Sequence, residues 1–408
     1  MFAFALLPSL AVFNVFVDPY GIFPLASFSG AKWPKVEMIN NVKLHKSIKV
    51  SQLKPEAVVL GTSRSAFGID PNSNAWHESF KSRYNLSLAG GNTYVTYRYL
   101  EHAHTLSPLK QVIFGLDFFA FNTFRRQASD YRGDFLIVND DGSYNPHYKN
   151  NILSASLLST DALKSSFNTI TSKKKTPITI SENGMFIGPI WKDHLHEGFL
   201  AMEKLYFQHV YLAGKNREYA FINPDTGASS LEDFRKLVIY CSQNKIDLKL
   251  FISPLHARHQ EVIRTLGIWF LFEQWKREIV TILEEENYTS ELWDFSGYNS
   301  ITTDSIFANS NNFYRDSTHY HPIIGDMILS RISHNNDNNI PIDFGHILTQ
   351  QNIEDHLFSI QEEQTRYRTE HPEDVIEIES MSEKYDFELQ DLALIKNGAH
   401  SNATWQAK

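Results

Sequence analysis

Two short segments of the sequence carry the side chains that could do chemistry. The segment GTSR at residues 61–64 ends an apolar run, and DSTH at residues 316–319 places an aspartate three residues before a histidine. A serine hydroxyl is a weak nucleophile until a base removes its proton, and a carboxylate-oriented histidine can do so near neutral pH. We therefore predict acyl transfer, with Ser63 as the nucleophile, His319 as the base and Asp316 as the orienting carboxylate.

Each of these three residues also has a purely structural interpretation. Serine is a preferred N-cap, so Ser63 could simply begin a helix after the apolar run. Asp316 could cap the helix that we expect near Pro322, a role compatible with catalysis, and His319 could be a structural histidine. The sequence favours catalysis because the Asp-x-x-His segment accompanies the serine.

Other polar residues follow the predicted strands and could complete the site. The backbone N–H groups of Ser63 and Gly91 are candidates for an oxyanion hole, and Asn92 is a substitute donor. Arg64 could bind an anionic or sugar substrate, or form an ion pair that holds the turn. His256 could line the pocket or only shape its loop. The candidate substrate-binding residues are thus Arg64, Asp117 and His256.

Strand and helix signals alternate along the chain. Apolar runs predict strands at 57–60, 83–88, 111–119, 247–253 and 291–299. Helical periodicity covers 93–106, 230–244 and 259–286, with an interruption at Gly267. This alternation predicts an α/β fold with a mostly parallel sheet, in which the carboxyl ends of the strands meet at one edge. The candidate side chains would gather at that edge.

The segments that flank this repeat differ in composition. Residues 1–17 contain no charged side chain, which favours a single membrane anchor at 1–20 over a hydrophobic first helix packed on the domain. A connector follows at 21–44, and the α/β domain covers 45–335. Within it, 125–227 is an insertion that could form a lid. Residues 336–408 are predicted to be a helical and acidic C-terminal extension.

Composition and residue spacing argue against nucleic-acid binding and against a metal or cofactor. The 408 residues are 42 % hydrophobic, enough for a sizeable core, and the net charge of −9 argues against nucleic-acid binding. The single cysteine, Cys241, is expected to be a buried, inert thiol. Close histidine pairs occur at 102/104, 194/196 and 319/321, but no further ligands follow at a recognisable spacing, so we predict no metal and no cofactor. We assign one aromatic cluster to the core, namely Trp269, Phe270, Phe272 and Trp275.

The order of these motifs resembles that of the SGNH (GDSL-type) hydrolases. GTSR matches the first block of the family with Thr62 in place of its usual aspartate, NLSLAGGN at 85–92 is similar to the second with Gly91 (or Gly90) as the donor, and DSTH matches the last. GLDF at 115–118 departs from the pattern, because Asp117 stands where the family has its oxyanion asparagine. A carboxylate there would repel a developing oxyanion unless it is protonated or turned away. The resemblance implies a three-layer sandwich around a mostly parallel sheet.

Further segments are similar to those of membrane-anchored bacterial cell-envelope members of this superfamily, namely VDPYG, ISPLHA and WDFSGYN. The resemblance implies an inner-membrane, periplasm-facing esterase or O-acyltransferase that acts on an ester of an envelope glycan. The alternative is a non-catalytic envelope protein that binds a glycan or a protein. A soluble intracellular hydrolase is a third possibility.

Overall fold

A six-stranded sheet forms the centre of the computed structural model, which describes residues 2–23, 33, 35–76, 80–125, 130–173, 178–188, 194–214, 216–306, 313–335, 339–381 and 384. The strands are β1 (Ala57–Leu60), β2 (Arg83–Asn85), β3 (Gln111–Leu116), β6 (Asp247–Ile252), β7 (Leu292–Asp294) and β8 (His346–Leu348). Their order is β2-β1-β3-β6-β7-β8, and only β8 runs antiparallel to its neighbour. The predicted α/β fold with a mostly parallel sheet is confirmed.

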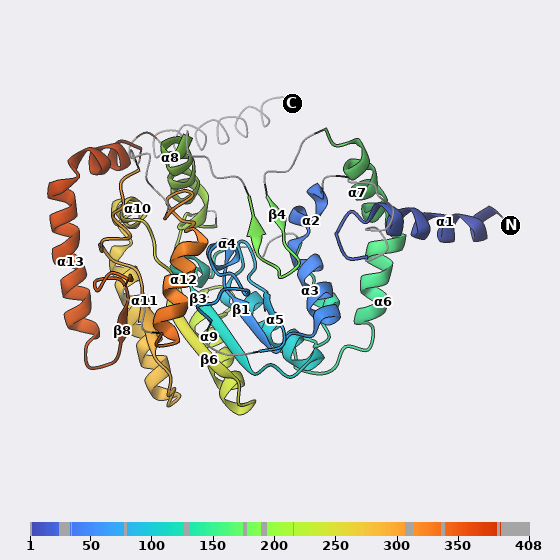
Figure 1. Cartoon of the computed structure of the whole chain (residues 1–408), viewed down its shortest axis with the longest axis horizontal. Helices are drawn as coiled ribbons and strands as arrows, with labels where there is room; N and C mark the ends of the chain where they lie inside the picture. The colour runs from blue at the N-terminus through green and yellow to red at the C-terminus, as the bar shows by residue number, and fades with distance from the viewer. Residues whose placement is uncertain are drawn as a thin grey trace, which may run out of the picture.

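Helices cover both faces of this sheet (Figure 1). Val58 and Leu60 face a core shared with α5 (Thr93–Leu106), α9 (Ser230–Gln243) and α11 (Trp269–Glu285). Ala57 and Val59 face the opposite core, which includes α12 (Pro322–Ile332). Alternate residues of β1 thus point to opposite faces, and the strand reads as a continuous apolar run because both faces are buried.

Several boundaries differ from the prediction. β2 ends at Asn85 and β3 at Leu116, before a 3-10 turn at Phe118–Phe121. The predicted long helix is two helices, α10 (Ala257–Thr265) and α11, and Gly267 between them has a φ of +71°. That interruption is confirmed, as is the burial of Cys241, which raises the pKa of its thiol to about 12. In the aromatic cluster Phe272 and Trp275 are buried, but the core assignment of Phe270 was wrong because its ring is exposed.

Three described segments of the insertion pack against different parts of the molecule. The segment with α6 (Tyr148–Leu153), the π-helix η4 (Ser154–Leu158) and α7 (Thr160–Thr171) packs with the N-terminal α1 (Phe2–Val17), at the end of the molecule opposite α13 (Ile353–Glu370) (Figure 1). The hairpin of β4 (Thr179–Ile180) and β5 (Phe186–Ile187) packs on α4 (Ser63–Gly68). The third part, α8 (Leu195–Leu205) and the π-helix η6 (Tyr206–Val210), packs on residues of the α10 region.

The two ends of the chain are helical. α2 (Val36–Asn40) and α3 (Val42–Leu53) follow α1, and most of the predicted connector, 24–32, lies outside the described residues. In the C-terminal region α13 buries an apolar face with Ile353, Leu357 and Ile360. A further helical stretch covers 372–381, and 385–408 lie outside the described residues. Among the helices that the structure describes, none combines the length and the apolar character needed to cross a membrane.

Candidate active site

Ser63 is the first residue of α4, directly after β1. Gly61 makes the intervening turn with a φ of +146°, and a Cβ on it would lie only 2.4 Å from the Ser65 hydroxyl. The N-cap of α4 is Thr62, whose hydroxyl accepts the Arg64 N–H at 3.3 Å. The interpretation of Ser63 as the N-cap is therefore wrong. Its hydroxyl is half-buried at the carboxyl edge of the sheet.

The structure brings Ser63, His319 and Asp316 together in one chain of contacts. His319 Nε2 lies 2.8 Å from Ser63 Oγ, and His319 Nδ1 lies 2.8 Å from Asp316 Oδ2. Because the carboxylate can only accept, Nδ1 carries the proton toward Asp316, and Nε2 is left to accept one from the serine. These distances are those expected between a nucleophile, its base and the group that orients the base.

The loop that carries His319 is fixed by Asp316 itself. Asp316 Oδ1 accepts the backbone N–H groups of Thr318 and His319, each at 2.9 Å. Burial would raise the pKa of Asp316, but the His319 ring and these N–H groups outweigh it and lower that pKa to about 2. α12 begins only at Pro322, with His321 as its N-cap, so Asp316 closes its own turn rather than capping the helix.

Aromatic packing holds the histidine ring from the side. The ring of Phe67, in α4, meets His319 edge-on with centroids 5.1 Å apart, and Phe186 of β5 packs against Phe67 at 5.3 Å. The insertion therefore supports the site through its β4–β5 hairpin. No sequence signal marked this pair, because two apolar residues far apart in the chain carry no pattern.

Arg64 and Asp117 form an internal ion pair under the turn. Arg64 Nη1 lies 2.8 Å from Asp117 Oδ1, and the hydroxyl of Thr62 donates to Asp117 Oδ2 at 2.6 Å. Both side chains are almost inaccessible, so the substrate-binding role predicted for them is corrected to one of holding the turn. Asp117 points at a cation, which removes the expected conflict between its carboxylate and an oxyanion.

His256 also serves the structure rather than a ligand. It is buried and caps α10, with Nδ1 accepting the Arg258 N–H at 3.2 Å and Nε2 on the Asp304 carbonyl at 2.8 Å. Burial lowers its pKa to about 4. Both ring nitrogens are occupied, so the prediction that His256 binds substrate is corrected to the loop-shaping alternative.

The predicted oxyanion donors are not equivalent. The Gly91 N–H already donates to the Leu88 carbonyl at 3.0 Å, closing a turn in which Gly90 has a φ of +64°. The assignment of Gly91 is therefore corrected. Asn92 Oδ1 caps α5 by accepting the Val95 N–H at 2.9 Å, which leaves its amide NH₂ group as a donor. Within the described ranges the Ser63 N–H has no acceptor.

Sequence reasoning missed two cations near the loop after β2. Lys46 is fully buried in α3 and donates to the carbonyls of Asn85 and Ser87 at 2.9 and 2.6 Å, and burial lowers its pKa well below the ordinary value. The Arg125 guanidinium lies over the Phe119 ring, 4.6 Å from its centroid, and borders a cavity of about 500 Å³ that Asn92 also lines. The only sequence feature that pointed to Arg125 was its position after the third predicted strand.

Apart from His319, the paired histidines are not part of the candidate site. His102, for example, bonds to the Ser47 carbonyl at 3.0 Å and accepts the Ile137 N–H at 3.0 Å. Throughout the part of the chain that the structure describes, no group of three or more His, Cys, Asp or Glu side chains is arranged to hold a metal ion.

The fold and this site together define an α/β protein with a serine–histidine–aspartate arrangement at the carboxyl edge of its sheet. No protein-family model matches the chain, and no curated protein sequence matches it. The function must therefore be argued from the geometry.

Proposed function

We propose that this protein is a serine esterase or O-acyltransferase of the SGNH type. The observation that carries the proposal is the continuous line of contacts from Ser63 Oγ through the His319 ring to Asp316, each 2.8 Å long. Ser63 is separated from Asp316 by 253 positions and from His319 by 256 positions in the chain. The three side chains nevertheless meet in the order that acyl transfer requires. The central parallel sheet and the position of Ser63 after its strand are compatible with the SGNH sandwich.

The chemistry follows from which atom holds the proton. Ser63 Oγ attacks the ester carbonyl carbon while its proton moves to His319 Nε2. The negative Asp316 stabilises the imidazolium that forms. When the tetrahedral intermediate collapses, the C–O bond to the leaving alcohol breaks, and His319 returns the proton to that alcohol. Water then releases the acid in an esterase, or a sugar hydroxyl takes the acyl group in a transferase.

Two donors support an oxyanion hole at this position. The Ser63 N–H lies in the first turn of α4, where backbone N–H groups have no partner inside the helix. The Asn92 amide lies at the start of α5 on the loop that follows β2. Fixed donors of this kind stabilise charge that develops in the transition state.

We further propose that the substrate is an ester of a cell-envelope glycan and that the protein faces the periplasm from the bacterial inner membrane. Both statements rest on the motif resemblance and on the uncharged first seventeen residues. The cavity of about 500 Å³ that Asn92 and Arg125 line is in the size range of small-molecule sites, but Ser63, His319 and Asp316 do not line it.

A fluorophosphonate probe tests the chemistry directly. The full chain should be labelled covalently, and Ser63→Ala should abolish labelling. Ser107→Ala is the matched control, because Ser107 is also half-buried but lies at the far end of α5. Folded wild-type protein that resists the probe and does not hydrolyse acetyl esters, yet binds an envelope glycan, would establish the non-catalytic alternative instead.

A further inference from the structure

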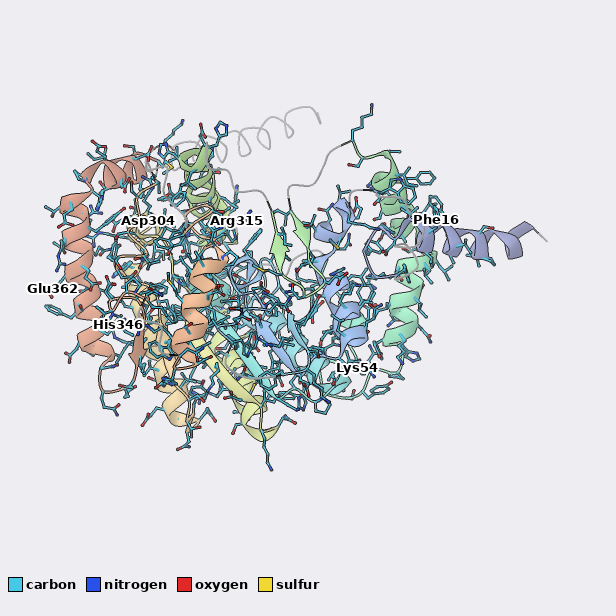
Figure 2. The ribbon with its side chains drawn as sticks, viewed as in Figure 1. Phe16, Lys54, Asp304, Arg315, His346 and Glu362 are labelled. Carbon is cyan, nitrogen blue, oxygen red and sulfur yellow. The ribbon has the colours of Figure 1, made fainter. Side chains whose placement is uncertain are left out.

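The end of the molecule formed by α1, α6, η4 and α7 exposes an unusual amount of apolar side chain. Seven large apolar residues there are between 38 and 69 % exposed, and we call them the apolar platform: Leu7, Val12, Phe16, Leu153, Leu158, Phe167 and Ile170. α1 packs directly on η4 and α7, with the rings of Phe13 and Phe167 5.5 Å apart. Phe16 lies on this helix, well away from the central sheet (Figure 2).

Helix α7 of the platform buries small polar side chains and exposes large apolar ones, although Asp161, Lys164, Asn168 and Thr171 are exposed as well. In α7 the small polar residues Ser165, Ser166 and Thr169 are buried, whereas the large apolar Phe167 and Ile170 are exposed. A surface helix in water normally presents its polar face outward. Helices that pack in lipid do the reverse, with small and polar residues at their contacts.

α1 follows the same inverted pattern. Its Asn14 is fully buried and faces the protein, where its amide donates to the Leu157 carbonyl at 2.8 Å and its oxygen accepts the Ser166 hydroxyl at 2.7 Å. No acidic or basic residue occurs from Phe2 to Val17. The polar amide is thus satisfied inside, and among the described side chains of α1 the exposed ones are Leu7, Pro8, Ser9, Val12 and Phe16.

The first charged residue marks where the apolar environment ends. Asp18 follows α1 and is buried, with its carboxylate accepting the N–H groups of Ile22 and Phe23 at 2.8 and 3.2 Å. Lys35 lies 3.6 Å from the same carboxylate and donates to the Asp18 carbonyl at 2.6 Å. The charge nearest α1 is therefore held at the junction of this helix with the body, whereas Lys149 of α6 and Asp161 and Lys164 of α7 are exposed.

We propose that the whole apolar platform, and not α1 alone, is embedded in a lipid bilayer. The described residues of α1, Phe2–Val17, extend over about 24 Å at 1.5 Å per residue. The insertion helices α6, η4 and α7 extend the lipid-facing surface beside α1. The protein is thus held at the membrane in the way that a monotopic membrane protein is. This inference stands independently of the catalytic proposal.

Vesicle partitioning tests the contribution of α7. The full chain is mixed with vesicles of phosphatidylethanolamine and phosphatidylglycerol, and the partition coefficient is measured by flotation. The double variant Phe167→Gln/Ile170→Gln should lower it about tenfold or more, since each apolar side chain removed from lipid weakens binding. Phe270→Gln/Phe358→Gln is the control, because these rings are exposed to a similar degree on α11 and α13.

A fluorescent label gives a second, independent measurement. Cys241 is buried with a raised thiol pKa, so Phe167→Cys can be labelled selectively with an environment-sensitive dye. Vesicles should shift its emission to the blue, and spin-labelled lipids should quench it, whereas the same dye at Phe358→Cys should not respond. Unquenched dye at residue 167 together with unchanged partitioning would limit lipid contact to α1 and overturn the proposal. A vesicle-independent dimer that the α7 double variant dissociates would overturn it in favour of a contact between two copies.

Discussion

Two carboxylates, Asp316 and Asp117, form ion pairs of the same length next to the turn at Ser63. Asp316 lies 2.8 Å from the His319 ring, and Asp117 lies 2.8 Å from the Arg64 guanidinium. The first pair is partly exposed and continues to the Ser63 hydroxyl. The second is closed, because Thr62 occupies the remaining carboxylate oxygen of Asp117.

The two ion pairs differ in their exposure and in their third partner, which is Ser63 in one and Thr62 in the other. These two features, rather than the ion pair itself, distinguish a catalytic arrangement from one that only holds the turn. Ser63 and Arg64 are consecutive in α4, yet the serine reaches the site and the arginine points inward between the rings of Phe119 and Tyr206. A histidine can gain or lose its proton during a reaction, whereas an arginine stays charged. Only the Asp316 pair can therefore act on a proton.

Replacing Asp316 should have the largest effect on activity. In Asp316→Asn the histidine loses the carboxylate that fixes its tautomer and stabilises the imidazolium, so kcat should fall about 10³- to 10⁴-fold. The loss of one carboxylate with a depressed pKa should lower the free energy of unfolding by about 2.6 kcal/mol at most. Hydrolysis of an acetyl ester and urea unfolding measure the two effects. Unchanged kcat in folded Asp316→Asn would show that His319 works without this partner.

Replacing Asp117 should have the opposite profile. Asp117→Asn introduces the residue type that SGNH enzymes use in the oxyanion hole, but here it strands the buried Arg64 charge. The free energy of unfolding should therefore fall by about 3 kcal/mol or more. The double variant Arg64→Met/Asp117→Asn should recover part of that loss, because no charge is then left alone. Higher kcat with unchanged stability in Asp117→Asn would mean that residue 117 faces the substrate after all.

The sequence was sufficient for features that are local. The apolar run at 57–60 predicted β1 because every side chain in it is buried, and the DSTH segment predicted the Asp316–His319 contact because four residues close one turn. Gly267 predicted the break between α10 and α11 because a left-handed residue after a helix favours glycine.

Features that depend on distant partners were not predictable. Gly91 looked like a free donor, but its N–H is used by Leu88 in a turn that only the backbone conformation reveals. Arg64 meets Asp117 across 53 residues, so the sequence left its two roles open. The edge strand β8 has three residues and one buried side chain, too few for any periodicity.

The smallest expected effect concerns the pH dependence of activity. The pKa of Asp316 is lowered to about 2, below its usual unfolded value of about 3.9. Its carboxylate therefore stays ionised until the pH falls toward 2. Its contribution to stability is complete above about pH 4 and is lost progressively as the pH falls from there through 2. Above about pH 4 this carboxylate should add no step of proton uptake, so log kcat/KM should fall with a slope no steeper than one as the pH is lowered.

A slope of two above about pH 4 would mean that the Asp316 carboxylate takes up a proton in that range, which contradicts the strong acceptor role that the structure gives Asp316. Circular dichroism at each pH separates this result from acid unfolding. Asp117→Asn provides the matched control. Breaking the buried Asp117–Arg64 pair should lower the stability but should leave the slope of log kcat/KM against pH unchanged.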